Sequence, residues 1–194
     1  FAGALDGGDE GDKGSDKGND RPDKKRAPPS ATPGEPPTRA VRIVSRGDDG
    51  GGGGIAWSDD GQSLAIQIRA IDNKDRWIAT VDFADHKLVN QNRLTDAAWI
   101  NWSFNEFGWT KDNRTLWYDS EASGYSMLYT MTPGGKPTAL THGKFEVSNP
   151  VQSPDGKWFY VRANVQAPYA YDVYRVAVGG GKLERITSLQ GMGY

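Results

Sequence analysis

A twelve-residue stretch, IAWSDDGQSLAI at residues 55–66, carries the pattern that organises most of this chain. In it an apolar run, a serine, a tight Asp-Asp-Gly turn and a second apolar run follow one another. Glycine takes a positive φ in such a turn at little cost, so the pattern predicts two antiparallel strands joined by a hairpin. The pattern returns in FGWTKDNRTLWY at 107–118 and in PVQSPDGKWFYV at 150–161. The chain therefore contains three copies of one β unit.

The spacing of these copies predicts the architecture. The turn residues Asp60, Asp112 and Asp155 lie 52 and 43 residues apart, and a period of about 40–50 residues is typical of a four-stranded propeller blade. Third strands are expected at 76–82, 125–130 and 172–178, and fourth strands at 93–95, 139–141 and 185–187. The predicted fold is all-β, a partial β-propeller of about three four-stranded blades at 41–98, 99–144 and 145–194.

Three blades are too few to close a ring, because propellers typically have about four to eight. Each end of the array would expose an unpartnered sheet face. We therefore expect the chain to be part of a larger propeller or to assemble with further copies of itself as a homo-oligomer.

Residues 1–40 have a different composition. Aspartate, glycine, lysine and proline dominate, and the segment cannot bury enough apolar surface to fold on its own. We interpret it as a low-complexity mobile segment or inter-blade loop. A calcium site in the Asp/Gly run is the alternative, but the ligand spacing and closing glutamate of an EF-hand loop are missing.

The sequence lacks the features that several classes of function require. A net charge of −2 provides no electrostatic case for binding nucleic acid or an anionic membrane, and no apolar run reaches the roughly 20 residues that span a bilayer. There is no cysteine, and His86 and His142 have no further metal ligands at a suitable spacing. No G-x-S-x-G nucleophile elbow occurs. We therefore expect no catalytic residue, no metal and no cofactor in this chain.

The most aromatic stretch is WINWSFNEF at residues 99–107. It places four aromatic side chains and one carboxylate before the second copy of the repeat. One interpretation is packing between blades, where large rings fill the wedge between neighbouring sheets. The other is that some of these side chains contact a peptide in a cavity.

This stretch, together with LWYDSEASGYSMLY at 116–129 and NPVQSPDGKW at 149–158, resembles the propeller of prolyl oligopeptidase family serine peptidases, and most closely the bacterial dipeptidyl-peptidase-IV-like branch. The resemblance covers about residues 41–194. It implies that an α/β-hydrolase domain of the same parent chain carries a Ser-Asp-His triad, while the propeller restricts access and adds residues to the peptide pocket. It also implies a periplasmic or exported location, although no signal is visible here.

By position, the resemblance implies that Trp102, Phe104 and Glu106 contact a peptide substrate. One feature departs from the family. Its dipeptidyl peptidases hold the free amino group of the substrate with two adjacent glutamates on the propeller, and this chain has no Glu-Glu pair.

Three functions follow as hypotheses. The first is a non-catalytic propeller segment of a serine peptidase, whether dipeptidyl-peptidase-like or prolyl-oligopeptidase-like. The second is a stand-alone interaction propeller of the TolB or WD-repeat kind. The third, a carbohydrate-active propeller, needs a second carboxylate paired with Glu106 across a cleft, and it ranks last because the sequence alone does not pair Glu106 with one.

Overall fold

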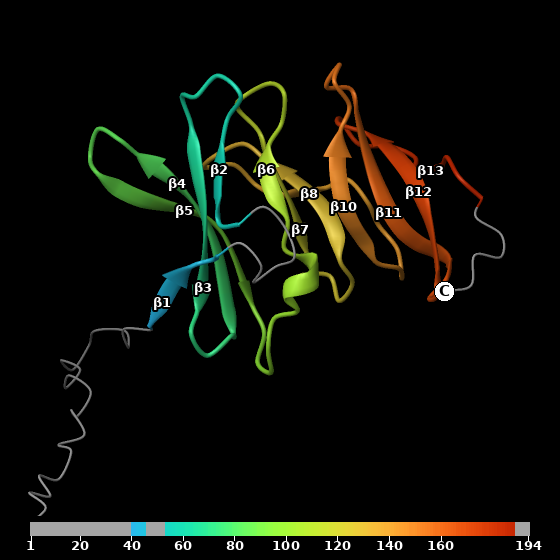
Figure 1. Ribbon diagram of the computed structural model, residues 1–194, viewed down its shortest axis with the longest axis horizontal. Helices are drawn as coiled ribbons and strands as arrows, with labels where there is room; N and C mark the ends of the chain where they lie inside the picture. Colours follow the sequence, from blue (N-terminus) through green and yellow to red (C-terminus); the bar gives the residue numbers. More distant parts are fainter. Residues whose placement is uncertain (1–39, 46–52, 189–194) are drawn as a thin grey trace, which may run out of the picture. The chain divides into compact units, whose positions relative to one another are not determined.

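A computed structural model describes residues 40–45 and 53–188 of the chain. Within these residues the structure consists of β-strands in three antiparallel sheets and one short 3-10 helix (Figure 1). This confirms the predicted all-β, partial-propeller fold. The predicted low-complexity segment, with its calcium alternative, lies outside the described residues except for Ala40.

The first sheet has five strands, paired in the order β1-β3-β4-β5, with β2 also paired to β3. Their bounds are Val41–Ile43 for β1, Ile55–Trp57 for β2, Leu64–Ala70 for β3, Asp75–Asp82 for β4 and Lys87–Thr95 for β5.

The second and third sheets have four strands each, paired in sequence order. The second contains β6 (Phe107–Trp109), β7 (Leu116–Ser120), β8 (Met127–Met131) and β9 (Thr138–Ala139). The third contains β10 (Val147–Gln152), β11 (Trp158–Ala167), β12 (Ala170–Ala177) and β13 (Glu184–Arg185). The 3-10 helix η1 (Trp102–Phe104) lies between the first and second sheets in the chain. The predicted blade boundaries fall in the connections between the sheets and stay a prediction.

The repeated hairpin turn is built as its residue types predict. The hydroxyl groups of Ser58, Thr110 and Ser153 each donate to the aspartate two residues later, at 2.5–2.7 Å. The residue after that aspartate has a positive φ of 68° at Gly61, 61° at Asn113 and 72° at Gly156. The Ser/Thr-x-Asp-Gly/Asn pattern therefore encodes one turn three times.

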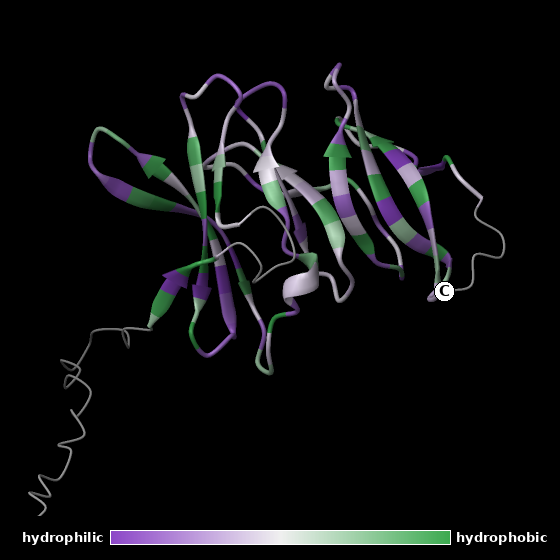
Figure 2. Cartoon of the chain, viewed as in Figure 1, coloured by the Kyte–Doolittle hydropathy of each residue, from purple (hydrophilic) through white to green (hydrophobic). Residues whose placement is uncertain are grey.

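Apolar and polar residues alternate along the strands, as the coloured bands of Figure 2 show on β11 and β12. One face of the second sheet packs Leu116, Tyr118 and Met131 against Ala65 and Ile78 of the first sheet. The opposite face packs Leu128 and Trp117 against the third sheet, whose contribution comes from Val147, Phe159, Val161, Tyr174 and Val176. The core among the described residues therefore has two layers, one between each pair of neighbouring sheets, and a smaller third cluster of Val44, Leu94, Ile100 and Trp102.

The first sheet differs from the expected four strands because two short strands share one edge. β1 pairs with residues 68–70 of β3, and β2 pairs with residues 64–66 of the same strand. Between them, the Gln67 carbonyl accepts from Val44 N at 3.0 Å, and Gln67 N donates to the Gly54 carbonyl at 2.8 Å. β1 and β2 thus act as one interrupted first strand. In the third sheet, β10 has a register shift between Ser148 and Val151, near the corresponding position.

The outer face of the first sheet remains open among the described residues. Ile43, Ile55 and Trp57 point to this face and are each about half exposed. Phe107 and Trp109, which hold the positions of Ile55 and Trp57 in the second sheet, pack instead against the first sheet. The open face therefore has the apolar pattern of a surface that another blade covers. No helix of the described residues is long and apolar enough to cross a membrane.

Candidate functional site

Because the strands are antiparallel, the connection between the second and third strand of each sheet lies at the same end as the link from one sheet to the next. We call this the loop end, and it consists of residues 71–74, 96–106, 121–126, 140–146 and 168–169. Large apolar side chains are exposed here on all three sheets. The exposed fractions are 58% for Ile71, 61% for Trp99, 37% for Tyr125 and 89% for Tyr169.

The opposite end has a different character. Its turns at 58–63, 110–115 and 153–157 consist of polar residues, glycine and one proline. One large apolar side chain there, Phe83, is half exposed but stacks on Trp57 with ring centroids 5.9 Å apart. Exposed apolar side chains also lie on strands, among them Ile55, Leu88 and Val151, but in the connections between described strands those other than Phe83 lie at the loop end. Exposed apolar surface of this kind is typical of interaction sites.

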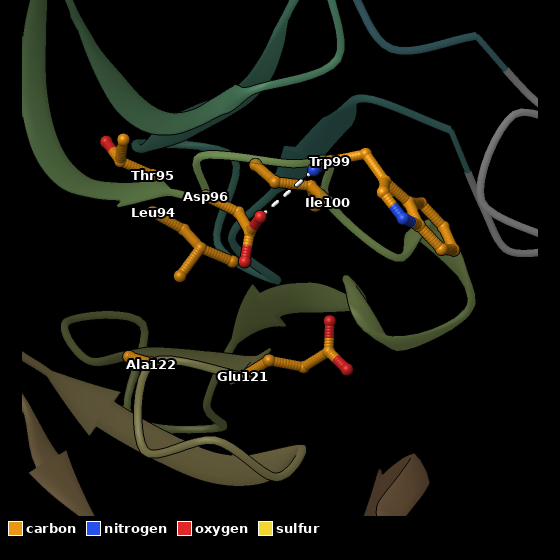
Figure 3. A pocket seen from close by; sticks show the side chains of 7 residues that line it. All are labelled: Leu94, Thr95, Asp96, Trp99, Ile100, Glu121 and Ala122. Carbon is orange, nitrogen blue, oxygen red and sulfur yellow. Dashed lines mark hydrogen bonds between the residues drawn. The ribbon is translucent and has the colours of Figure 1, made fainter.

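A pocket of about 210 Å³ opens at the loop end between the first two sheets (Figure 3). The end of β5 and the link that follows it form one wall, and the β7–β8 turn forms the other. The lining residues are Leu94, Thr95, Asp96, Trp99, Ile100, Glu121 and Ala122. A lining with two carboxylates and an exposed indole suits a ligand group that is positively charged, because a cation is attracted both by carboxylates and by an aromatic face.

The two carboxylates of the pocket have different tasks. Asp96 accepts from Ala98 N at 2.7 Å and from Trp99 N at 3.0 Å, and so fixes the turn that presents Trp99. Glu121 extends from the β7–β8 turn toward the side of the pocket that carries Trp99 (Figure 3). Partial burial, and then the negative charges of Glu146 and Asp96, raise the pKa of Glu121, while a hydrogen bond from the Asn101 backbone opposes them. A cation in the pocket would relieve this unfavourable environment.

The link from 96 to 106 is held in place by the first sheet. Asn73, at a φ of 62°, accepts from Ile100 N at 2.9 Å through its carbonyl and donates from Nδ2 to the Ile100 carbonyl at 3.3 Å. The Trp102 indole N–H donates to Asn73 Oδ1. Gln67 Nε2 donates to the Asn105 carbonyl at 2.7 Å. The loop carrying Trp99 is therefore clamped at two points rather than free.

Trp102 lies in η1 and is buried with Val44, Leu94 and Ile100. Its ring also lies under the Arg69 guanidinium, 4.8 Å from the ring centroid. These contacts belong to packing within and beside the first sheet. Its predicted contact with a substrate stays a prediction, and such a contact would require this cluster to open.

Phe104 ends η1 and is half-buried, and Glu106 is also half-buried. Glu106 Oε2 accepts from Asn149 N at 2.7 Å and so links the second sheet to the third. Neither residue lines the pocket with Trp99. Their predicted substrate contacts likewise stay predictions.

Sequence reasoning missed Asp96, Trp99 and Glu121 as members of one site. Trp99 belongs to the aromatic stretch, and Glu121 belongs to the Ser-Glu-x-x-Gly-Tyr segment that resembles the peptidase family, but 22 residues separate them in the chain. Their convergence depends on the pairing of neighbouring sheets, which no local motif reveals. Among the described residues, no group of three His, Cys, Asp or Glu side chains could hold a metal ion.

The sequence model of the dipeptidyl peptidase IV (DPP IV) N-terminal region matches residues 46–194. No curated protein matches the chain.

Two solved structures are similar in fold. The crystal structure of Porphyromonas gingivalis dipeptidyl peptidase 4 matches at a TM-score of 0.57 and 16% identity, over 68% of this chain and 19% of that one. The crystal structure of TolB from Acinetobacter baumannii matches at a TM-score of 0.51 and 21% identity, over 69% of this chain and 32% of that one. The chain spans far less than half the length of either, and at these identities the likeness is one of fold.

Proposed function

Because the chain belongs to the family of the dipeptidyl peptidase IV N-terminal region, we propose that it is a non-catalytic propeller segment of a serine peptidase. In this proposal the catalytic triad lies in an α/β-hydrolase domain of the same parent protein. The segment restricts access to that domain and contributes to the peptide-binding pocket. The observation that carries the proposal is the recurrence of an exposed apolar side chain in a loop-end connection of each of the three sheets, together with the pocket at the same end.

The loop end suits the docking of a folded domain. Ile71, Tyr125 and Tyr169 each come from the connection between the second and third strand of a different sheet, so the apolar contacts recur from sheet to sheet. Aromatic side chains are enriched and charged ones are depleted at the centre of protein interfaces. The hydrolase domain would cover these tips, and the pocket beside Trp99 would then face the space between the two domains.

The pocket supports a role for Glu121 in binding a positively charged group of the peptide. The chain lacks the Glu-Glu pair that the family's dipeptidyl peptidases use for the substrate's amino group. Glu121, with Asp96 nearby and Trp99 opposite, provides negative charge and an aromatic face in the pocket at the loop end. An ammonium group would pair with the carboxylate and lie against the indole ring.

The test compares Glu121→Gln with the wild type in the full-length protein that contains this chain. The substitution keeps the shape of the side chain and removes its charge, so KM for a dipeptidyl substrate with a free amino group should rise about tenfold. KM for the N-acetylated form should not change. Glu184→Gln is the matched control, because Glu184 lies on β13 and pairs with Arg175 away from the pocket. An unchanged KM for the free-amine substrate in Glu121→Gln would exclude this role.

The fold similarity to TolB favours one second candidate, a stand-alone propeller that binds a protein partner. On this alternative the loop end docks a separate protein rather than a hydrolase domain. A pull-down that returns one stoichiometric partner, together with no hydrolysis by the full-length protein, would favour it over the peptidase segment.

A further inference from the structure

Two carboxyl side chains face each other across the first two strands of the second sheet. Asp119 N donates to the Glu106 carbonyl at 2.9 Å, which places the two residues directly opposite each other. Residues opposite each other in an antiparallel pair lie on the same face with their Cβ atoms about 4.5–5.5 Å apart, and like charges in that position repel. One carboxyl of such a pair must therefore change its charge or move away.

Asp119 cannot move toward water, because its side chain is completely buried. Neither of its carboxyl oxygens accepts from a donor among the described residues. Burial and then the Glu106 charge raise the pKa of Asp119 well above its ordinary value, and a hydrogen bond with Glu106 adds to this shift. These effects favour the neutral acid, which has a proton to donate.

One buried cation opposes this shift. Arg76 on β4 has a fully buried guanidinium group, and its Nη1 donates to the backbone carbonyl of Asp119 at 3.2 Å rather than to its carboxyl group. Two uncharged side chains belong to the apolar layer on this side of the second sheet. They are Leu128, directly across from Asp119 on β8, and Tyr174 on β12, whose hydroxyl group has no hydrogen-bond partner among the described residues.

Glu106 also contacts the third sheet. Its Oε2 accepts from Asn149 N at 2.7 Å, and its Oε1 lies 3.5 Å from Asn149 Nδ2. Asn149 has a φ of 52° and lies in the register shift of β10. Glu106 is also the last residue of the link that carries Trp99. A change at Glu106 therefore acts on both the contact between the second and third sheets and the loop end.

We propose that Asp119 and Glu106 share one proton, and that this proton holds the contact between the second and third sheets. With the proton present, the Asp119 hydroxyl donates to the Glu106 carboxylate, which accepts from Asn149. Without it, two adjacent carboxylates repel, and Glu106 releases Asn149. Because the raised pKa belongs to the folded state, the stabilisation is complete at low pH and is lost as the pH rises through the pKa of the folded pair. The contact between the second and third sheets is therefore stronger at acidic pH and weaker at alkaline pH.

Infrared difference spectra of the full-length protein provide the direct test. At neutral pH, the spectrum of the wild type minus that of Asp119→Asn should contain the C=O band of a protonated carboxylic acid. Asp172→Asn is the matched control, because Asp172 is buried but paired with Arg185, and its difference spectrum should contain carboxylate bands instead. Carboxylate bands alone in the Asp119→Asn difference would overturn the proposal.

A second variant covers the case in which Asp119→Asn does not fold. In Glu106→Gln a neutral amide replaces the carboxylate that accepts the proton, while Asp119 stays buried, so the protonated band should remain but move to higher frequency because its hydrogen bond is weaker. Hydrogen exchange of residues 147–152, corrected for the intrinsic pH dependence, gives a second readout. Protection should fall at least about tenfold from mildly acidic to alkaline pH in the wild type and stay constant in Glu106→Gln. Protection that is independent of pH in the wild type would contradict the proposal.

Discussion

Arg93 donates from Nε to the completely buried carboxylate of Asp75 at 2.8 Å, and Thr95 donates to the same oxygen at 2.6 Å. The arrangement recurs in the third sheet, where Arg185 and Thr187 donate to buried Asp172. In the second sheet the corresponding positions are held by Met127, Ala139 and Thr141, and Met127 is part of an apolar cluster. The chain therefore uses an ionic and an apolar version of the same strand contact.

The ionic version can be tested against the apolar one in the first sheet. Arg93→Ala leaves the buried Asp75 carboxylate without its cation and should lower the free energy of unfolding by about 3 kcal/mol. The double variant Asp75→Met with Arg93→Ala reproduces the second sheet, and it should remain within about 1 kcal/mol of the wild type. Urea unfolding followed by tryptophan fluorescence measures both. A double variant less stable than Arg93→Ala would show that the two versions are not interchangeable.

Gly108 leaves room for one ring of the second sheet. A Cβ atom at this position would lie 2.9–3.0 Å from atoms of the Trp117 indole, which packs on Phe159 of the third sheet. Gly108→Ala should therefore cost about 1–3 kcal/mol, because the rigid ring cannot withdraw without disturbing the layer. Gly179→Ala is the control, since a Cβ atom there meets nothing within 4 Å. Equal stabilities of the two variants in thermal unfolding would rule out the steric explanation.

The open face of the first sheet should govern self-association of the isolated chain. Ile55 and Trp57 are about half exposed on this face, next to the exposed Ile43. The double substitution Ile55→Lys with Trp57→Lys places two like charges on the face and should reduce association at a given concentration. Analytical ultracentrifugation of the chain measures the effect. Val89→Lys on β5 is the control.

The turn chemistry made most of the fold predictable. Ser58, Asp60 and Gly61 determine a hairpin locally, and three copies at a blade-like spacing determine the repeat. The interrupted first strand was not predictable, because β1 and β2 meet only through their shared partner β3. The expected fourth strand at 93–95 was too short, because β5 begins at Lys87 with exposed residues that have no apolar alternation.

The candidate site was less predictable than the fold. Local patterns indicated that residues 99–107 mattered, but Trp99 and Trp102 look alike in sequence, and only tertiary packing exposes the first and buries the second. The Glu106–Asp119 pair and buried Arg76 arise from the alignment of strands and sheets. Their charge suggested exposure, and the fold places Asp119 and Arg76 in the interior.

Hydrolysis of a chromogenic dipeptide that contains proline, by the full-length protein and by this chain alone, tests the central claim most directly. If the chain is the non-catalytic propeller segment of a serine peptidase, the full-length protein should release the chromophore and the isolated chain should show no turnover at any pH. Turnover above background by the purified chain would contradict the assignment of the chemistry to another domain. An inactive full-length protein would contradict the peptidase proposal itself.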